Sequence, residues 1–111
     1  MENINLMSWA DAASSLISVA SGREPADLVI RNCSWVNVHT REILPNTNIA
    51  IKNGRFAYCG PEITHCIGKN TETIEADGRF AIPGLCDAHM HIESGMLTPG
   101  QFAHAVMAHG T

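Results

Sequence analysis

The chain has 111 residues, 45% of them hydrophobic and 16% charged, which is ordinary for a soluble globular domain. Seven lysines and arginines against 11 aspartates and glutamates give a net charge of −4. The charges are scattered and no basic patch is evident, so we expect no nucleic-acid partner. No stretch reads as a secretion signal or a bilayer span, so we expect no membrane partner and a cytoplasmic location.

A helix is predicted from Ser8 to about Ser21. Ser8 and Asp11 resemble a capping box, Gly22 is suited to end the helix, and Pro25 prevents its continuation. The expected apolar stripe consists of Trp9, Ala13, Leu16 and Ala20. Residues 1–26 are therefore interpreted as an amino-terminal helix and linker.

From residue 27 the pattern changes to short strands. The predicted strands cover residues 28–32, 35–39, 48–52, 55–59, 71–75 and 79–82. Residues 40–47 are expected to be a polar connection, whereas Asn53-Gly54 is expected to close a two-residue hairpin. Residues 27–82 are thus predicted to be a small, mostly antiparallel, sandwich-like β domain.

Four cysteines, at positions 33, 59, 66 and 86, show no regular spacing and no C-x-x-C pair. Without a secretion signal we expect them to be reduced and mostly buried. Cys86 lies next to the histidine-rich segment, but strand alternation would turn it away from the histidines and into a packed face.

The segment after Pro83-Gly84 is the strongest functional signal in the chain. If it forms a strand starting near Leu85, alternation places four potential ligands on one face, namely Asp87, His89, His91 and Glu93. Imidazole is the commonest protein ligand of zinc and similar ions, and two imidazoles two residues apart can converge on one ion. We therefore predict a metal site that contains His89 and His91.

Less specific interpretations stay open at this site. A chain with six histidines produces a His-x-His by chance, and such a pair can be solvated or structural. Glu93 could be a further ligand or a hydrogen-bond partner, and Asp87 is better suited to a structural or second-layer role. No catalytic residue is assigned within these 111 residues.

A helix capped by Thr98 and Gln101 is predicted to follow, to about residue 109.

The run Pro-Gly-Leu-Cys-Asp-Ala-His-Met-His, from Pro83 to His91, resembles the first-strand motif of the amidohydrolase superfamily, metal-dependent hydrolases built on a (β/α)8 barrel. The continuation Ile-Glu-Ser-Gly-Met-Leu-Thr-Pro and the upstream residues 19–29 are similar to adenine deaminases of that superfamily. Those enzymes usually have a second serine at the position of Gly95.

The resemblance implies a fold and a reaction. A barrel needs about 250 residues, so residues 83–111 are expected to be its first strand and helix, truncated, and the whole chain an α+β fragment. The implied cofactor is a divalent transition metal (Mn, Fe or Zn), in a binuclear site whose other ligands come from later strands. The implied substrate is a purine base, adenine, hydrolysed to hypoxanthine and ammonia; a homo-oligomer is left open. With two ligands, the 111 residues alone are expected to be inactive.

Other functions are compatible with parts of the pattern. His91-Ile92-Glu93 fits the H-x-E of a second zinc deaminase family, but the P-C-x-x-C that this family requires is missing. A different amidohydrolase, such as a cyclic amidase or an amino-sugar deacetylase, would share the strand motif. A non-enzymatic β domain with incidental histidines is the remaining alternative.

Overall fold

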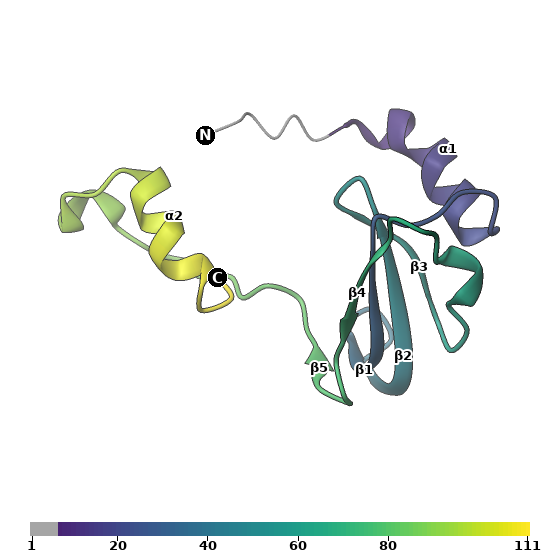
Figure 1. Ribbon diagram of the computed structural model, residues 1–111. Coiled ribbons are helices and arrows are strands. Elements are labelled where there is room, and N and C mark those ends of the chain that lie inside the picture. The colour runs from purple at the N-terminus through teal and green to yellow at the C-terminus, as the bar shows by residue number, and fades with distance from the viewer. Residues whose placement is uncertain (1–6) are drawn as a thin grey trace. The chain divides into compact units, whose positions relative to one another are not determined.

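The computed structural model describes residues 7–111. The chain divides into two compact units, a sheet unit that ends at Ala81 and a carboxyl-terminal unit, Ile82–Thr111. The elements follow one another as shown in Figure 1: α1 (Trp9–Ala20), β1 (Leu28–Asn37), β2 (Glu42–Lys52), β3 (Arg55–Gly60), η1 (Thr64–Cys66), β4 (Glu72–Glu75), β5 (Phe80–Ala81), η2 (Ile92–Gly95) and α2 (Pro99–Met107). The α+β class predicted from sequence is therefore found in residues 7–111.

The sheet is mixed rather than mostly antiparallel. Its order is β3-β2-β1-β4, with β5 beside β1. β1 pairs antiparallel with β2, and β2 with β3, but β4 and β5 both run parallel to β1. β3 and β4 lie at opposite ends of this order, and residues 61–71 form the crossover connection that brings β4 beside β1 in the parallel direction. The described residues form this single sheet, so they do not make the predicted sandwich on their own.

Two strands are longer than predicted because they contain bulges. The register between β1 and β2 shifts on either side of Cys33, which pairs with Thr47. Asn32 and Asn46 have positive φ angles of 53° and 52°, a conformation that asparagine tolerates better than most residues. The predicted break in residues 33–34 and the predicted connection over residues 40–47 are therefore wrong, and a turn around residues 38–41 joins the strands.

The hairpin turn predicted at Asn53-Gly54 is confirmed. Ile51 pairs with Phe56 and Lys52 with Arg55, so the loop contains two residues. Asn53 and Gly54 have φ angles of 52° and 69°, as a type I′ turn requires. This turn fixes the register at the start of β3.

Helix α1 packs on β2, β3 and η1. The Ser8 hydroxyl accepts a hydrogen bond from the Asp11 N–H, which confirms the predicted cap. The buried face consists of Ala12, Leu16 and Val19; of the predicted stripe, Leu16 is buried and Ala13 half-buried, whereas Trp9 and Ala20 are exposed. Trp9 is 67% exposed in the first turn, where the Arg55 guanidinium lies 4.6 Å from its ring centroid.

Alternate residues of the central strands build two cores. Val29 and Ala50 face α1 and η1, in a cluster completed by Val19, Ala26, Ile63 and Cys66. The opposite face holds Cys33, Ile49 and Ala76, beside half-buried side chains of Ile30, Trp35, Ile51, Cys59 and Ala81. The period of two along β1 and β2 therefore distributes apolar residues to both sides of the sheet.

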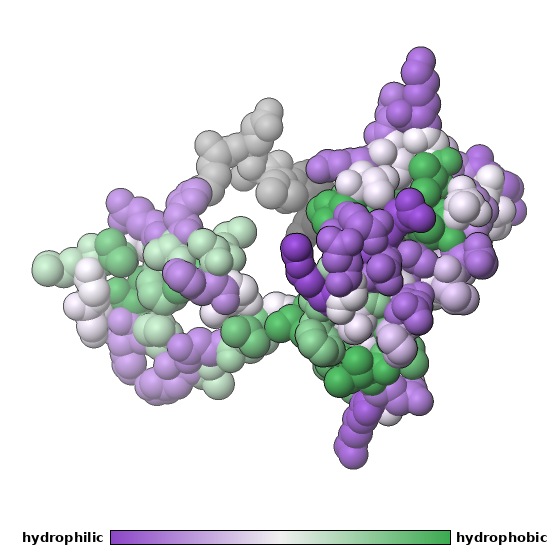
Figure 2. Space-filling view, turned by 60° about the horizontal axis from the view of Figure 1, so that its bottom comes forward, coloured by the Kyte–Doolittle hydropathy of each residue, from purple (hydrophilic) through white to green (hydrophobic). Residues whose placement is uncertain are grey.

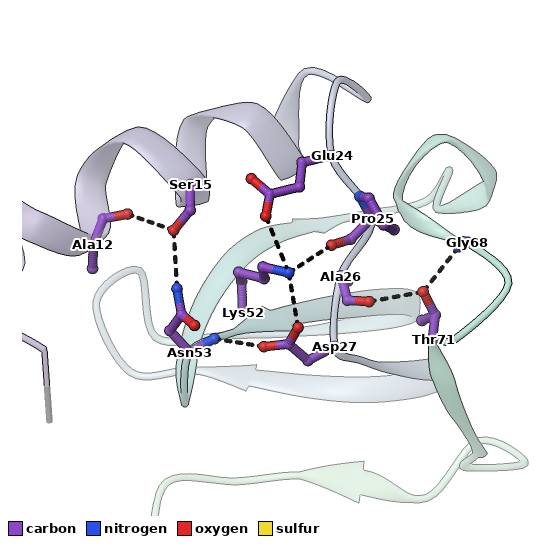
Figure 3. A network of polar contacts seen from close by, with 10 residues as sticks. All are labelled: Ala12, Ser15, Glu24, Pro25, Ala26, Asp27, Lys52, Asn53, Gly68 and Thr71. Atoms are coloured by element: carbon purple, nitrogen blue, oxygen red, sulfur yellow. Dashed lines mark hydrogen bonds and ion pairs between the residues drawn. The ribbon is translucent and has the colours of Figure 1, made fainter. Parts of the chain in front are cut away.

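A polar network fixes the chain between α1 and β1. Lys52 Nζ lies 2.8 Å from Asp27 Oδ1 and 3.2 Å from Glu24 Oε1, and it also donates to the Pro25 carbonyl (Figure 3). Asp27 Oδ2 accepts from the Asn53 N–H at 2.8 Å. The entry of β1 is thereby attached to the β2–β3 turn, across 25 or more positions of sequence.

All four cysteines are free, as predicted. Cys33 and Cys66 are buried and Cys59 is half-buried, whereas Cys86 is exposed. Burial, with a further contribution from nearby Cys33, raises the pKa of Cys59 to about 11. Cys59 is therefore a neutral thiol at pH 7, and its role is packing.

The carboxyl-terminal unit contains η2, α2 and an extended segment. The predicted cap of α2 is confirmed: Thr98 and Gln101 form a reciprocal capping box with Pro99 at the first helical position. No residue of this unit is buried. Its exposed large apolar side chains are Ile82, Leu85, Met90, Met96, Leu97 and Met107, and green apolar patches lie among purple polar ones on its surface in Figure 2.

No helix within residues 7–111 combines the length and the apolar character needed to cross a bilayer.

Candidate metal centre

The segment that carries the predicted ligands is extended but is not a strand. Residues 82–91 have no ladder partner in the described chain, and η2 begins at Ile92. A strand needs a neighbour that exchanges a series of backbone hydrogen bonds with it, and within residues 7–111 this segment makes a single one to a distant residue, from the Leu85 N–H to the Gly110 carbonyl. The predicted strand from Leu85 is therefore wrong for this chain, and of the predicted barrel unit only the helix is formed.

Loss of the strand also changes the expectation for Cys86. Strand alternation predicted that Cys86 would face a packed apolar layer. Cys86, Met90 and Leu85 are instead exposed, because nothing in the described part of the unit covers them.

His89 and His91 nevertheless bring their rings together. The two Nε2 atoms are 3.0 Å apart, the ring centroids are 4.9 Å apart and the ring planes are inclined by 62°. Both residues are exposed. The same-side arrangement predicted for the two side chains is therefore found, although an extended, unpaired backbone produces it.

Glu93 lies on the other side of the His91 ring. Its Oε1 atom is 2.8 Å from His91 Nδ1, with side-chain exposures of 73% and 64% for Glu93 and His91. The hydrogen bond with His91, followed by a backbone hydrogen bond at Glu93 itself, lowers the pKa of the Glu93 carboxyl. Glu93 is therefore a carboxylate at neutral pH, directed at His91 and away from the two Nε2 atoms.

Asp87 does not join the ligand row. Its Oδ1 atom accepts a hydrogen bond from the backbone N–H of His89 at 3.1 Å, which is a local turn contact between residues two positions apart. This contact holds the backbone at His89 and leaves the His89 ring unaffected.

The Nε2 atoms of His89 and His91 fit part of a transition-metal site. Zinc–nitrogen bonds of about 2.0–2.1 Å in a tetrahedral arrangement place two ligand nitrogens about 3.3 Å apart, close to the 3.0 Å between the Nε2 atoms. Imidazole nitrogen is a ligand that zinc, iron and related ions accept. His89 and His91 could thus hold one ion together.

Two nitrogens are not a complete centre. A catalytic zinc site has three protein ligands and a water, and no group of three or more histidine, cysteine, aspartate or glutamate side chains within residues 7–111 is arranged to hold an ion. The sequence pattern could not decide whether Glu93 binds the ion or hydrogen-bonds a histidine, because a glutamate two positions after His91 is compatible with either role. In the described residues Glu93 contacts His91 Nδ1.

Known proteins match all or nearly all of this chain. It is 62% identical over 111 residues to the adenine deaminase of Ruegeria pomeroyi and covers 18% of that protein. It is 59% identical over 103 residues to the adenine deaminase of Mesorhizobium japonicum, of which it covers 17%. It is also 48% identical over 101 residues to the adenine deaminase of Clostridium botulinum, again covering 17%.

The chain therefore spans less than a fifth of the length of these curated relatives, consistent with an amino-terminal portion. No protein-family model matches it. A crystal structure of a Bacillus thuringiensis protein aligns with a TM-score of 0.48 at 23% identity, over 68% of this chain and 96% of the other. The resemblance to adenine deaminases inferred from the sequence motifs is confirmed across the whole of this chain.

Proposed function

We propose that this chain is the amino-terminal part of a metal-dependent adenine deaminase, which hydrolyses adenine to hypoxanthine and ammonia. The observation that carries the proposal is the 62% identity over all 111 residues to a protein of that name. The converging imidazoles of His89 and His91 support it, because they provide two neighbouring donors of the type a transition metal takes.

In the proposed enzyme, His89 and His91 bind one divalent ion, Mn, Fe or Zn, through their Nε2 atoms. When bound, such an ion lowers the pKa of a coordinated water and supplies a hydroxide nucleophile for C6 of adenine. The contribution of this chain is to hold the two imidazoles with their Nε2 atoms 3.0 Å apart. The remaining ligands, a second ion and the groups that transfer protons belong to parts of the protein outside these residues.

The overall reaction is balanced by one water. Oxygen is added at C6, the C6–N bond breaks, and the amino group leaves as ammonia after it has gained a proton. Adenine is a neutral purine, so the net charge of −4 of this chain does not oppose its binding. The proposed location of the enzyme is the cytoplasm, where purine bases are available for salvage.

The test is an assay of the full-length protein with adenine. Purified protein, freed of metal with a chelator and reloaded separately with Mn(II), Fe(II) or Zn(II), is expected to release ammonia and form hypoxanthine in equal amounts. Cytosine, a cyclic amide and an N-acetyl amino sugar serve as alternative substrates. Turnover of one of these without turnover of adenine would overturn the proposed reaction and retain only a metal-dependent hydrolase.

A further inference from the structure

One contact of the candidate centre concerns a residue that is not itself a ligand. The neutral imidazole ring carries one proton, and whichever nitrogen holds it cannot bind a metal ion. A ligand that is to bind through Nε2 must therefore keep its proton on Nδ1. In metal sites a carboxylate or a carbonyl that accepts this Nδ1–H commonly fixes the choice.

Within residues 7–111, His91 has such an acceptor and His89 does not. Glu93 Oε1 lies 2.8 Å from His91 Nδ1, whereas no hydrogen bond of His89 Nδ1 is present within residues 7–111. The carboxylate next to His89 is that of Asp87, and it accepts from the backbone N–H rather than from the ring. The two histidines are therefore prepared differently for binding an ion.

We propose that Glu93 is a positioning residue, which accepts the His91 Nδ1–H and so directs the Nε2 lone pair of His91 to the metal. This inference rests on the proposed function, because it takes the ion held by His89 and His91 as given. Glu93 does not bind the ion itself. Its carboxylate is on the Nδ1 side of the imidazole, the opposite side from Nε2, which faces His89 Nε2 at 3.0 Å.

Local structure explains why Glu93 reaches the ring. Ile92 starts the η2 turn, which folds the chain back directly after His91. The turn carries Glu93 to the Nδ1 edge of the His91 ring, two positions away. In a continued strand, residues 91 and 93 would project from the same face about 6.6–6.8 Å apart along the chain. The change from extended chain to a 3-10 turn at residue 92 is therefore part of the positioning device.

The experiment measures the affinity of the metal-free, full-length protein for Zn(II) by competition with a chromophoric chelator. Glu93→Ala removes the acceptor and is expected to weaken Zn(II) binding by about 10–100-fold. Glu93→Gln keeps a neutral acceptor oxygen of the same reach and is expected to recover part of this loss. Glu72→Gln, an exposed carboxylate of β4 changed in the same way, controls for net charge and is expected to bind like wild type.

The outcomes separate this inference from the proposed function. Zn(II) affinities of Glu93→Ala and wild type within twofold of each other would overturn the positioning role, while adenine deaminase activity of the wild type would stand. A wild type that binds no Zn(II) would overturn both. A crystal structure of the Zn(II)-loaded protein with a Glu93 oxygen within about 2.2 Å of the ion would make Glu93 a ligand and overturn the positioning role.

Discussion

The carboxylate of Asp27 at the start of β1 lies 2.8 Å from the ammonium of Lys52 at the end of β2. The same carboxylate accepts the N–H of Asn53, the first residue of the hairpin turn. One aspartate therefore connects the entry of the first strand to the turn between the second and third. Asp27 and Lys52 are in direct contact although they are 25 positions apart in the sequence.

Asp27→Asn is expected to lower the free energy of unfolding by about 0.5–1 kcal/mol. The variant loses the ion pair with Lys52 but keeps an amide oxygen that can accept the Asn53 N–H. The effect stays small because the Asp27 side chain is 52% exposed and water screens the pair. Urea unfolding measures it, and Glu62→Gln, an exposed carboxylate in the loop after β3, is the charge-matched control. Equal losses in both variants would refute a specific role for the pair.

The contribution of Asp27 should also depend on pH. Burial tends to raise the pKa of Asp27, but the hydrogen bonds from Lys52 and from the Asn53 N–H outweigh burial and lower it. A lowered folded-state pKa stabilises the protein above the ordinary aspartate pKa of about 3.9, and the stabilisation is lost as the pH falls through the folded-state value. The difference between wild type and Asp27→Asn should be constant from about pH 5 to 8 and shrink below about pH 4. A constant difference down to pH 2 would contradict it.

Gly54→Ala is expected to destabilise the sheet unit by about 1–2 kcal/mol, because Gly54 has a φ of 69° and a Cβ atom is strained in that conformation. Gly54→Asn is the matched control, since asparagine tolerates positive φ and should cost less. Urea unfolding again provides the measurement. A loss from asparagine equal to that from alanine would show that the left-handed backbone is not the cause.

The elements predicted correctly from sequence are those whose signals are local. Asn53-Gly54 specifies its turn by the conformations of two residues, and Thr98 with Gln101 specifies the start of α2 by bonds within one turn. The resemblance to adenine deaminases likewise depended on a contiguous motif at Pro83–His91. None of these requires knowledge of the distant chain.

The errors occur where distant contacts decide the structure. β2 continues through Pro45 and Asn46 because pairing with β1 outweighs the local preference for a turn. β4 joins β1 in parallel, which no alternation pattern reveals. The ligand segment is apolar on alternate positions, yet it forms no strand because a strand also needs a neighbour. The sequence identified the residues of the candidate site. It did not predict that the Glu93 carboxylate would lie at the Nδ1 edge of the His91 ring.

His89→Ala and His91→Ala in the full-length protein are each expected to abolish detectable adenine turnover and to lower the bound metal. Both side chains are exposed within residues 7–111, so the free energy of unfolding of the metal-free protein should change by less than about 0.5 kcal/mol. His104→Ala, an exposed histidine of α2 in the same unit, is the matched control and should retain metal and activity. Full metal content in both variants would rule out the proposed ligands.

The last prediction compares the 111 residues with a complete enzyme. Residues 1–111 alone are expected to bind Zn(II) weakly and to leave adenine unchanged. Two imidazoles leave the ion coordinated mostly by water, so the pKa of the bound water falls less than in a site with three protein ligands. The donors are also exposed, and water-free surroundings and positioning of the substrate account for several kcal/mol of a catalysed barrier.

A chimera makes the comparison direct. The 111 residues replace the segment of the Ruegeria pomeroyi adenine deaminase to which they are 62% identical, and the unaltered relative is the positive control. Ammonia release from adenine is followed at equal molar concentrations with Mn(II), Fe(II) or Zn(II). The chimera is expected to convert adenine, whereas the same chimera with His91→Ala is expected not to. This pair of results would show that activity depends on a residue of this chain. Turnover by residues 1–111 alone at a rate near that of the chimera would show that the centre is complete without further ligands. A folded but inactive chimera beside an active relative would show that this chain cannot supply the function proposed for it.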